Sequence, residues 1–199
     1  EAIIEEVLYS LKQQSLPTSM QLEIILIDGM SDDDTLNIIN KFKKANLDID
    51  IKILKNKKMY IPYALNIGLK ESAGRYICRM DTHTVYPQDY IKNCYEVMMD
   101  TDADNVGGYI ITKKFNNSLE ANIVQSVVTH KFGVGNSGFR VGRKDGIVDT
   151  IPYGFFKRSI FDKVGIFNEK LIRAQDYEMN RRMNKTNYDE TNCCPTSAN

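Results

Sequence analysis

The spacing of apolar residues predicts alternating strands and helices in the first part of the chain. Helical spacing near the amino terminus is followed by a short apolar run that ends at Asp28, and a second helical pattern comes next. Residues 49–54 alternate as a second strand, Pro62 begins another helix, and residues 76–80 form a third strand that ends at Asp81. This order of strand, helix, strand, helix and strand is typical of a doubly wound, mainly parallel sheet flanked by helices.

The pattern is looser in the second part of the chain. Residues 131–146 are rich in Gly, Lys and Arg and predict a long loop, which in a compact domain often has a functional role. The polar residues 186–199 show no periodicity, so we expect a disordered tail there. The other expected elements are helices at 90–99 and 176–183 and extended segments at 106–112 and 148–156.

The composition excludes several classes of protein. Lys plus Arg equals Asp plus Glu at 26 each, so the net charge is zero and a nucleic-acid partner is not expected. The four cysteines show no C-x-x-C spacing and there are only two histidines, which argues against structural zinc and favours reduced thiols. No apolar run approaches the roughly 18 residues of a membrane-spanning helix.

Two of the predicted strands end in an aspartate. Because ligands of open parallel sheets bind outside the carboxyl ends of the strands, we expect Asp28 and Asp81 to project into the same crevice. Either residue alone could be a helix cap or a turn residue, but together they favour a binding site. His83 follows Asp81 by two positions, and a carboxylate with an imidazole there suits Mn²⁺, or Mg²⁺ with more water in its shell.

Several motifs, in order along the chain, resemble those of family 2 glycosyltransferases. Asp28 ends a strand that runs into Gly-Met-Ser-Asp, similar to the family's strand ending in Asp before Gly-Ser-x-Asp. Asp81-Thr82-His83 stands where the family has an Asp-x-Asp metal motif, and Gln175-Asp176-Tyr177-Glu178 stands where it has Glu-Asp-x-Glu. Residues 64–68 and 73–77 resemble the helix and the strand that follow in the family. Tyr86-Pro87 and the Gly-Val-Gly-Asn loop resemble a subgroup, the succinoglycan-type exopolysaccharide transferases.

This resemblance implies a GT-A type α/β fold and an inverting transferase that uses a nucleotide-diphosphate sugar donor. By analogy, Asp28 reads the nucleobase, Asp81 and His83 hold Mn²⁺ or Mg²⁺ on the diphosphate, and Asp176 is the general base for the acceptor hydroxyl. A carboxylate in that role typically contributes about 10²- to 10⁴-fold in rate. The chain departs from the family pattern in two places, with His83 for the second metal-motif aspartate and Gln175 for the glutamate before the base.

The resemblance also implies the domain organisation and the partners. We expect one catalytic domain over residues 1–199, with a Rossmann-like nucleotide-sugar-binding half at 1–112, an acceptor-side half at 113–185 and the tail at 186–199. Because the chain starts at Glu1 inside a helical pattern, we expect it to be truncated at both ends. The expected acceptor is a saccharide or a lipid-linked sugar at the cytoplasmic face of the membrane, with any membrane association made through regions absent from this chain.

Other interpretations of these residues stay open. Asp176 alone could be a charge at a helix amino terminus. Lys57 and Lys58 could steer the donor diphosphate, although a solvated turn is the more common role of such a pair. The string Gly133-x-Gly135-x-x-Gly138 matches a dinucleotide fingerprint but lacks the flanking strand and apolar helix, so NAD binding is not expected. The alternatives to a glycosyltransferase are a sugar-phosphate nucleotidyltransferase and an inactive nucleotide-sugar-binding module.

Overall fold

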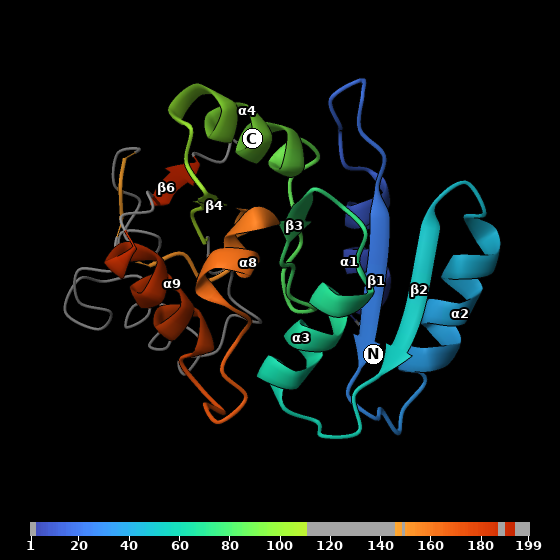
Figure 1. Cartoon of the computed structure of the whole chain (residues 1–199). Helices are drawn as coiled ribbons and strands as arrows, with labels where there is room; N and C mark the ends of the chain where they lie inside the picture. Colours follow the sequence, from blue (N-terminus) through green and yellow to red (C-terminus); the bar gives the residue numbers. More distant parts are fainter. Residues whose placement is uncertain (1–2, 111–145, 149, 187–189, 194–199) are drawn as a thin grey trace, which may run out of the picture.

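The strands of the molecule form two sheets that share one hydrophobic core (Figure 1). The computed structural model describes residues 3–110, 146–148, 150–186 and 190–193, the last four by their backbone. Across these ranges, no helix is long and apolar enough to cross a membrane.

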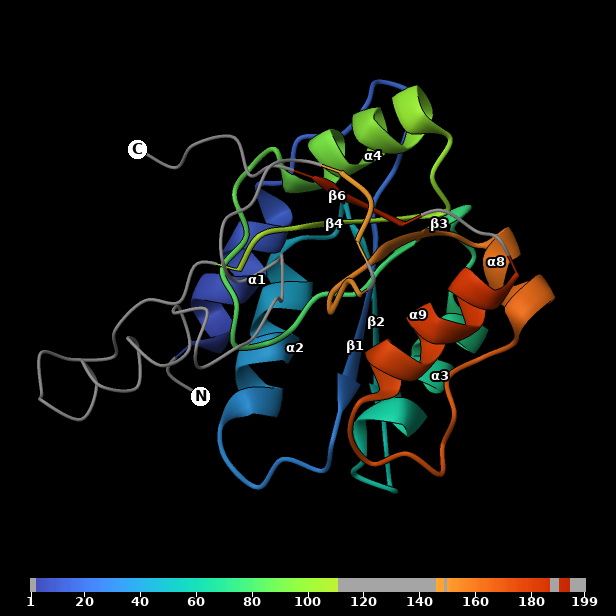
Figure 2. The ribbon, with the colours of Figure 1, turned by 90° about the vertical axis from the view of Figure 1, so that its left-hand side faces the viewer.

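The first sheet is a parallel pair of strands with helices on both faces. Its elements are α1 (Ile4–Lys12), β1 (Glu23–Asp28), α2 (Thr35–Ala45), β2 (Asp50–Lys55) and α3 (Ile61–Glu71). Strands β1 and β2 pair in register along their whole length, with Asp28 opposite Lys55 at the carboxyl end. Figure 2 shows α1 and α2 on one side of this sheet and α3 on the other. The predicted alternation of strands and helices, wound on both faces, is confirmed.

The second sheet is mixed, and it combines strands from distant parts of the sequence. Its elements are β3 (Tyr76–Cys78), α4 (Tyr90–Thr101), β4 (Asn105–Gly108), β5 (Phe155–Lys157), α8 (Ser159–Val164), α9 (Gln175–Lys185) and β6 (Glu190–Cys193). The strand order is β3-β5-β4-β6, with β5 antiparallel to both neighbours and β6 parallel to β4. In Figure 2 this sheet lies between α4 on one side and α9 on the other.

Strand β5 contributes to hydrophobic packing on both faces of the second sheet. Successive strand residues point to opposite faces, so Phe155 and Phe156 cannot pack on the same side. Phe155 belongs to the cluster that contains Met98 of α4, whereas Phe156 packs with Phe161 of α8 and Met179 of α9. Two adjacent residues of one strand therefore pack against helices on both sides.

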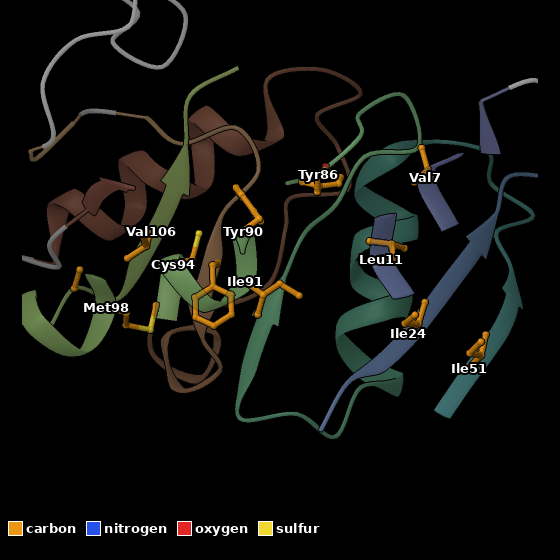
Figure 3. Packing of buried hydrophobic residues seen from close by; sticks show 12 residues of the cluster. Val7, Leu11, Ile24, Ile51, Tyr86, Tyr90, Ile91, Cys94, Met98 and Val106 are labelled. Atoms are coloured by element: carbon orange, nitrogen blue, oxygen red, sulfur yellow. The ribbon is translucent and has the colours of Figure 1, made fainter. Parts of the chain in front are cut away.

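The larger core cluster continues from one sheet to the other (Figure 3). Ile24 of β1 and Ile51 of β2 lie in the same buried cluster as Ile91 and Cys94 of α4. Cys78 packs against this cluster, where burial raises the pKa of its thiol to about 12 and keeps it protonated at neutral pH. Apolar contact across the boundary thus holds the two sheets in a fixed relation.

The structure differs from the expected elements in three places. The third strand ends at Cys78, three residues before Asp81, where its pairing with β5 ends; a hydrogen bond from the Arg79 N–H to the Gly154 carbonyl at 2.9 Å follows. The tail expected at 186–199 contains β6, whose backbone pairs with β4 although its sequence has no strand periodicity. The short helix α8 was not expected at all.

Gly154 occupies a position with no room for a side chain. A Cβ atom there would contact Asn105 Oδ1 and lie 2.5 Å from Cζ of Phe156. We expect Gly154→Ala to lower the free energy of unfolding by about 1–3 kcal/mol, the usual cost of overpacking, in urea denaturation. Gly29→Ala is the control, because a Cβ at Gly29 meets no described atom within 4 Å. Equal losses in the two variants would contradict this account of the packing.

Candidate functional site

Asp28 is the last residue of β1, as predicted, and its carboxylate organises the turn that follows. Oδ2 accepts the Met30 N–H and Oδ1 accepts the Ser31 N–H, each at 3.1 Å. Met30 has a left-handed φ of 69°, which an unbranched residue tolerates at some cost in strain. Asp28 is therefore buried and fixed in direction, and its oxygens keep lone pairs that can accept further hydrogen bonds.

The loop after β2 lies against the same end of the first sheet. The Asn56 N–H donates to the Asp28 carbonyl at 2.7 Å, and the buried Asn56 side chain accepts the Lys58 N–H at 3.1 Å and donates to the Tyr60 carbonyl at 2.9 Å. The Lys58 ammonium is exposed at this edge. The structure thus brings Asp28 and Lys58 to one edge of the sheet.

Asp81 and His83 lie on one turn beyond β3. The Asp81 Oδ1 accepts the His83 N–H at 2.9 Å, and the Asp81 N–H donates to the Tyr86 hydroxyl oxygen at 2.6 Å. Tyr86 is buried, and this burial raises the pKa of its hydroxyl, so it stays neutral. The buried Tyr86 therefore fixes the turn on its core side, while the His83 side chain is exposed to solvent.

Asp176 is held by a residue almost a hundred positions earlier in the chain. It lies in the first turn of α9, where its Oδ1 accepts a hydrogen bond from Nη1 of Arg79 in an ion pair. The same Nη1 donates to the Pro152 carbonyl at 3.0 Å, and the guanidinium lies 5.1 Å from the ring centroid of Tyr153. These contacts place Asp176 beside the segment that leads to Asp81.

The pKa of the Asp176 carboxyl responds to its burial and to two neighbouring charges. Burial raises the pKa of the Asp176 carboxyl, the Arg79 charge and hydrogen bond lower it, and the negative charge of Asp81 raises it again. The net direction is upward from the ordinary value of 3.8. A carboxyl with a raised pKa is a stronger base than a free aspartate, which suits proton abstraction.

Asp176 lies in the first turn of α9, as the alternative role of a charge at a helix amino terminus requires, but it does not cap the helix. The residue at the cap position of α9 is Ala174, with a left-handed φ of 60°, and this end of the helix has no side-chain cap hydrogen bond. The Asp176 carboxylate is instead directed toward Arg79. A charge placed only to interact with the helix dipole would not require a partner on another element.

The described side chains form no complete metal site by themselves. No group of three or more His, Cys, Asp or Glu side chains within the described ranges is arranged to hold an ion. Asp81 and His83, on one turn, offer one carboxylate and one imidazole, a donor set that fits Mn²⁺ or Mg²⁺ when phosphate oxygens and waters complete the shell. The residues present therefore fit an ion that arrives with a diphosphate.

Sequence reasoning missed Arg79 and Tyr86 as members of this site. The signal for Arg79 was a charged residue inside the apolar run that leads to Asp81, but its partner could not be read from local spacing. Tyr86 was singled out only as part of a family-like dipeptide. Residues 131–145 of the expected Gly-rich loop, including Gly133, Gly135 and Gly138, lie outside the described residues.

Two curated relatives are more than a quarter identical to this chain over the aligned residues. The chain is 28% identical over 172 residues to dolichyl N-acetyl-alpha-D-glucosaminyl phosphate 3-beta-D-2,3-diacetamido-2,3-dideoxy-beta-D-glucuronosyltransferase of Methanococcus voltae, covering 83% of this chain and 53% of the relative. It is 27% identical over 190 residues to succinoglycan biosynthesis protein ExoA of Rhizobium meliloti (strain 1021), covering 94% and 54%. The chain thus spans about half the length of the curated relatives it matches.

Solved structures of similar fold include a mannosyltransferase and a protein in complex with a nucleotide sugar. A mannosyltransferase of Pyrobaculum calidifontis, in complex with GDP-Man and Mn²⁺, has a TM-score of 0.68 at 16% identity, covering 99% of this chain and 54% of that one. TarS of S. aureus, in complex with UDP-GlcNAc, has a TM-score of 0.68 at 15% identity, covering 100% and 56%. These likenesses confirm the expected GT-A type α/β fold.

The family assignment rests on the sequence match as well as on the fold. The sequence model of glycosyl transferase family 2 matches residues 1–165, which is most of the chain. The motifs around Asp28 and Asp81 lie inside that range, whereas Asp176 lies beyond it. We conclude that this chain belongs to glycosyl transferase family 2.

Proposed function

We propose that this chain is the nucleotide-sugar-binding and catalytic part of an inverting, metal-dependent glycosyltransferase. The observation that carries the proposal is the placement of Asp176, a half-buried carboxylate of raised pKa that is paired with Arg79 and influenced by the charge of Asp81. A transferase of this kind needs one base beside the position of the donor diphosphate, and this cluster supplies it. Because the chain spans about half of its relatives, donor and acceptor are part of the proposal.

The donor is proposed to bind with its nucleobase at the first sheet and its diphosphate directed toward the second sheet. Asp28 accepts hydrogen bonds from the nucleobase, because its carboxylate is fixed at the carboxyl end of β1. The exposed Lys58 lies at the same edge, where an ammonium can attract a diphosphate as a point charge. The diphosphate extends toward the turn that carries Asp81 and His83.

Asp81 and His83 are proposed to hold a divalent cation, Mn²⁺ or Mg²⁺, against the diphosphate. A bound cation supplies charge neutralisation for the leaving nucleoside diphosphate. The Tyr86 hydroxyl fixes the backbone of Asp81, so the carboxylate is held in place before a ligand arrives. The support is the donor set on one turn together with the Mn²⁺ in a structure of similar fold.

The transfer step needs a single carboxylate on the acceptor side. Asp176 takes the proton from the acceptor hydroxyl, and the acceptor oxygen forms a bond to the anomeric carbon of the donor sugar. The bond from that carbon to the phosphate oxygen breaks, and the nucleoside diphosphate leaves with the electron pair. Attack from the face opposite the leaving group inverts the configuration of the anomeric carbon.

The acceptor is proposed to be a saccharide or a lipid-linked sugar. Support comes from the printed names of the relatives, one acting on a dolichyl-linked sugar phosphate and one named for succinoglycan biosynthesis. A lipid-linked acceptor would place the reaction at a membrane surface, for which we propose the cytoplasmic face.

A direct assay of product formation tests the proposed function. The protein is incubated with UDP-GlcNAc or GDP-Man, Mn²⁺ and a panel of octyl glycosides, and new glycosides are identified by mass spectrometry and NMR. We expect Mn²⁺-dependent transfer with inversion. Donor binding without any turnover would instead indicate an inactive binding module, and synthesis of a nucleotide sugar from a nucleoside triphosphate would indicate a nucleotidyltransferase.

Replacing Asp28 tests the nucleobase contact. Asp28→Asn keeps one side-chain oxygen for the turn but removes the charge, so we expect UDP or GDP affinity to fall by about tenfold or more, as hydrogen bonds to charged groups contribute about 1.5–3 kcal/mol. Calorimetry measures the Kd. Asp33→Asn is the control, since Asp33 is exposed and its carboxylate accepts the Thr35 N–H within its own loop. Equal affinity in Asp28→Asn and the parent would exclude the contact.

Replacing His83 tests the metal assignment. We expect His83→Ala to weaken the Mn²⁺-dependent part of UDP binding by at least about tenfold, while the melting temperature stays unchanged because the side chain is exposed. Titrations with and without Mn²⁺ separate the two parts of the affinity. Thr82→Ala, an exposed neighbour on the same turn, should bind like the parent. If His83→Ala retains the full effect of Mn²⁺, the histidine is not a ligand.

Replacing Asp176 tests the base. We expect Asp176→Asn to keep the donor Kd and to lose about 10²-fold or more of the transfer rate. The control is Glu178→Gln on the same helix, whose carboxylate accepts the Arg182 Nε–H at 2.7 Å and has no proposed part in transfer. An unimpaired transfer rate in Asp176→Asn would leave the mechanism without its base.

The pH dependence of transfer follows from the same residue. The base acts as a carboxylate, and burial raises the Asp176 pKa above 3.8. The transfer rate of the parent should therefore fall as pH is lowered through this raised pKa, and the acid limb should disappear in Asp176→Asn. Rates measured from pH 4 to pH 8, about the stable range of most domains, check this. An unchanged acid limb in the variant would assign it to another group.

A further inference from the structure

Arg79 lies between the two acidic residues of the proposed reaction, and no part of the mechanism above uses it. Its backbone continues from β3 toward Asp81, while its side chain reaches α9. One nitrogen, Nη1, donates to both the Asp176 Oδ1 and the Pro152 carbonyl. The side chain is only 10% exposed, so this is a largely desolvated contact rather than a surface ion pair.

The position of the guanidinium is fixed by groups other than Asp176. The segment just before β5 contributes two of them, the Pro152 carbonyl at 3.0 Å and the Tyr153 ring at 5.1 Å. The Arg79 backbone is held separately, because its N–H donates to the Gly154 carbonyl at 2.9 Å. A cation over an aromatic face is further stabilised by the ring quadrupole. Arg79 would therefore keep its direction without its acidic partner, and it can impose a direction on that partner.

The Asp176 carboxylate has one engaged oxygen and one that is available. Oδ1 accepts the Arg79 hydrogen bond, whereas Oδ2 has no hydrogen-bond partner among the described residues. The side chain is 18% exposed, which leaves a limited approach for a ligand. The backbone of α9 is anchored separately, by Asn180 Nδ2 donating to the Ile151 carbonyl at 3.0 Å. Arg79 therefore controls the rotation of the carboxylate, not the position of the helix.

We propose that Arg79 is the positioning residue for the general base, holding the Asp176 carboxylate so that Oδ2 is presented to the acceptor hydroxyl. The inference rests on the proposed role of Asp176. Proton transfer requires the base within hydrogen-bond reach of the acceptor oxygen, and a freely rotating carboxylate would spend much of its time turned away. The alternative, a buried ion pair that serves only the fold, is a weak source of stability because both charges must be desolvated.

Arg79→Met keeps an unbranched apolar stem and removes the guanidinium with its hydrogen bonds and its charge. We expect its transfer kcat to fall by about 10²-fold, the cost typical of a misplaced catalytic group, with the Kd for UDP in the presence of Mn²⁺ unchanged. Arg79→Lys should recover most of the lost rate, because a single ammonium can donate to both partners that Nη1 now serves. The donor and octyl glycoside pair is the one that gives transfer in the assay above.

Arg158→Met is the matched control for the loss of a half-buried arginine. Arg158 donates to Ser72 Oγ at 2.8 Å and to the Leu69 carbonyl at 3.2 Å, contacts that serve the packing of α3. We expect Arg158→Met to lower the melting temperature and leave the transfer kcat unchanged. If Arg79→Met fails to fold, Arg79→Lys decides the question, because a kcat as low as that of Asp176→Asn would overturn the proposal.

A double-mutant cycle separates positioning from independent action. If Arg79 acts through Asp176, then Arg79→Met should cost no further transfer rate once Asp176→Asn is present. Losses that multiply in the double variant would overturn the proposal, as would weaker UDP binding in Arg79→Met, which would make Arg79 a donor contact. Full transfer in Asp176→Asn alone would instead overturn the proposed base, so the two failures are distinguishable.

Discussion

The antiparallel pairing of β5 with β3 and β4 is the constraint on which the rest of the structure depends. Residues 155–157 come almost fifty positions after β4, yet they lie between two strands of the earlier sequence. Burying Phe155 on one face and Phe156 on the other stabilises the arrangement by about 1.5–3 kcal/mol for each side chain. Because Gly154 immediately precedes this strand and has no room for a Cβ, the segment that holds Arg79 is fixed as well.

The position of Arg79 beside β5 determines how the two nearby acidic residues are paired. Two carboxylates, Asp81 and Asp176, lie close enough for the charge of one to raise the pKa of the other. A single guanidinium offsets part of that repulsion, but it contacts only Asp176 by a hydrogen bond. Asp81 is left with a backbone N–H from His83 as its described side-chain partner, and it keeps capacity for a cation. Because only Asp176 is paired with the guanidinium, the two acids differ in their chemistry. In the proposed reaction Asp81 is a cation ligand and Asp176 is the base.

The first sheet could be predicted from the sequence because its signals are local. The apolar run ending at Asp28 and the helical spacing after it have the periods of strand and helix, and β1 ends where expected. Strand β3 was predicted too long, because the apolar run continues to Met80 whereas the pairing with β5 ends at Cys78. Strand β6 was missed, because its pairing is with a backbone 85 positions earlier and its sequence is polar. The Arg79–Asp176 pair had no local signal of any kind, since sequence periodicity does not report which distant residues meet.

The motif in α3 has a structural explanation that also bears on the proposed reaction. Asn66 donates to the Phe167 carbonyl at 2.9 Å and accepts the Phe167 N–H at 3.0 Å, so one side chain pairs with both backbone groups of a residue between α8 and α9. Gly68, one half-turn later, lies against Ile27 of β1. Leu69 of the same helix packs with Phe156 in the second sheet. Helix α3 therefore contacts the strand that ends at Asp28, the second sheet and the approach to the helix of Asp176. In the proposed reaction the donor lies between the end of β1 and the helix of Asp176. Its nucleobase and its reacting carbon can be held in place together only if the two sheets do not move independently. Side-chain packing and the Asn66 hydrogen bonds supply that rigidity, since no backbone hydrogen bond joins the described strands of one sheet to those of the other.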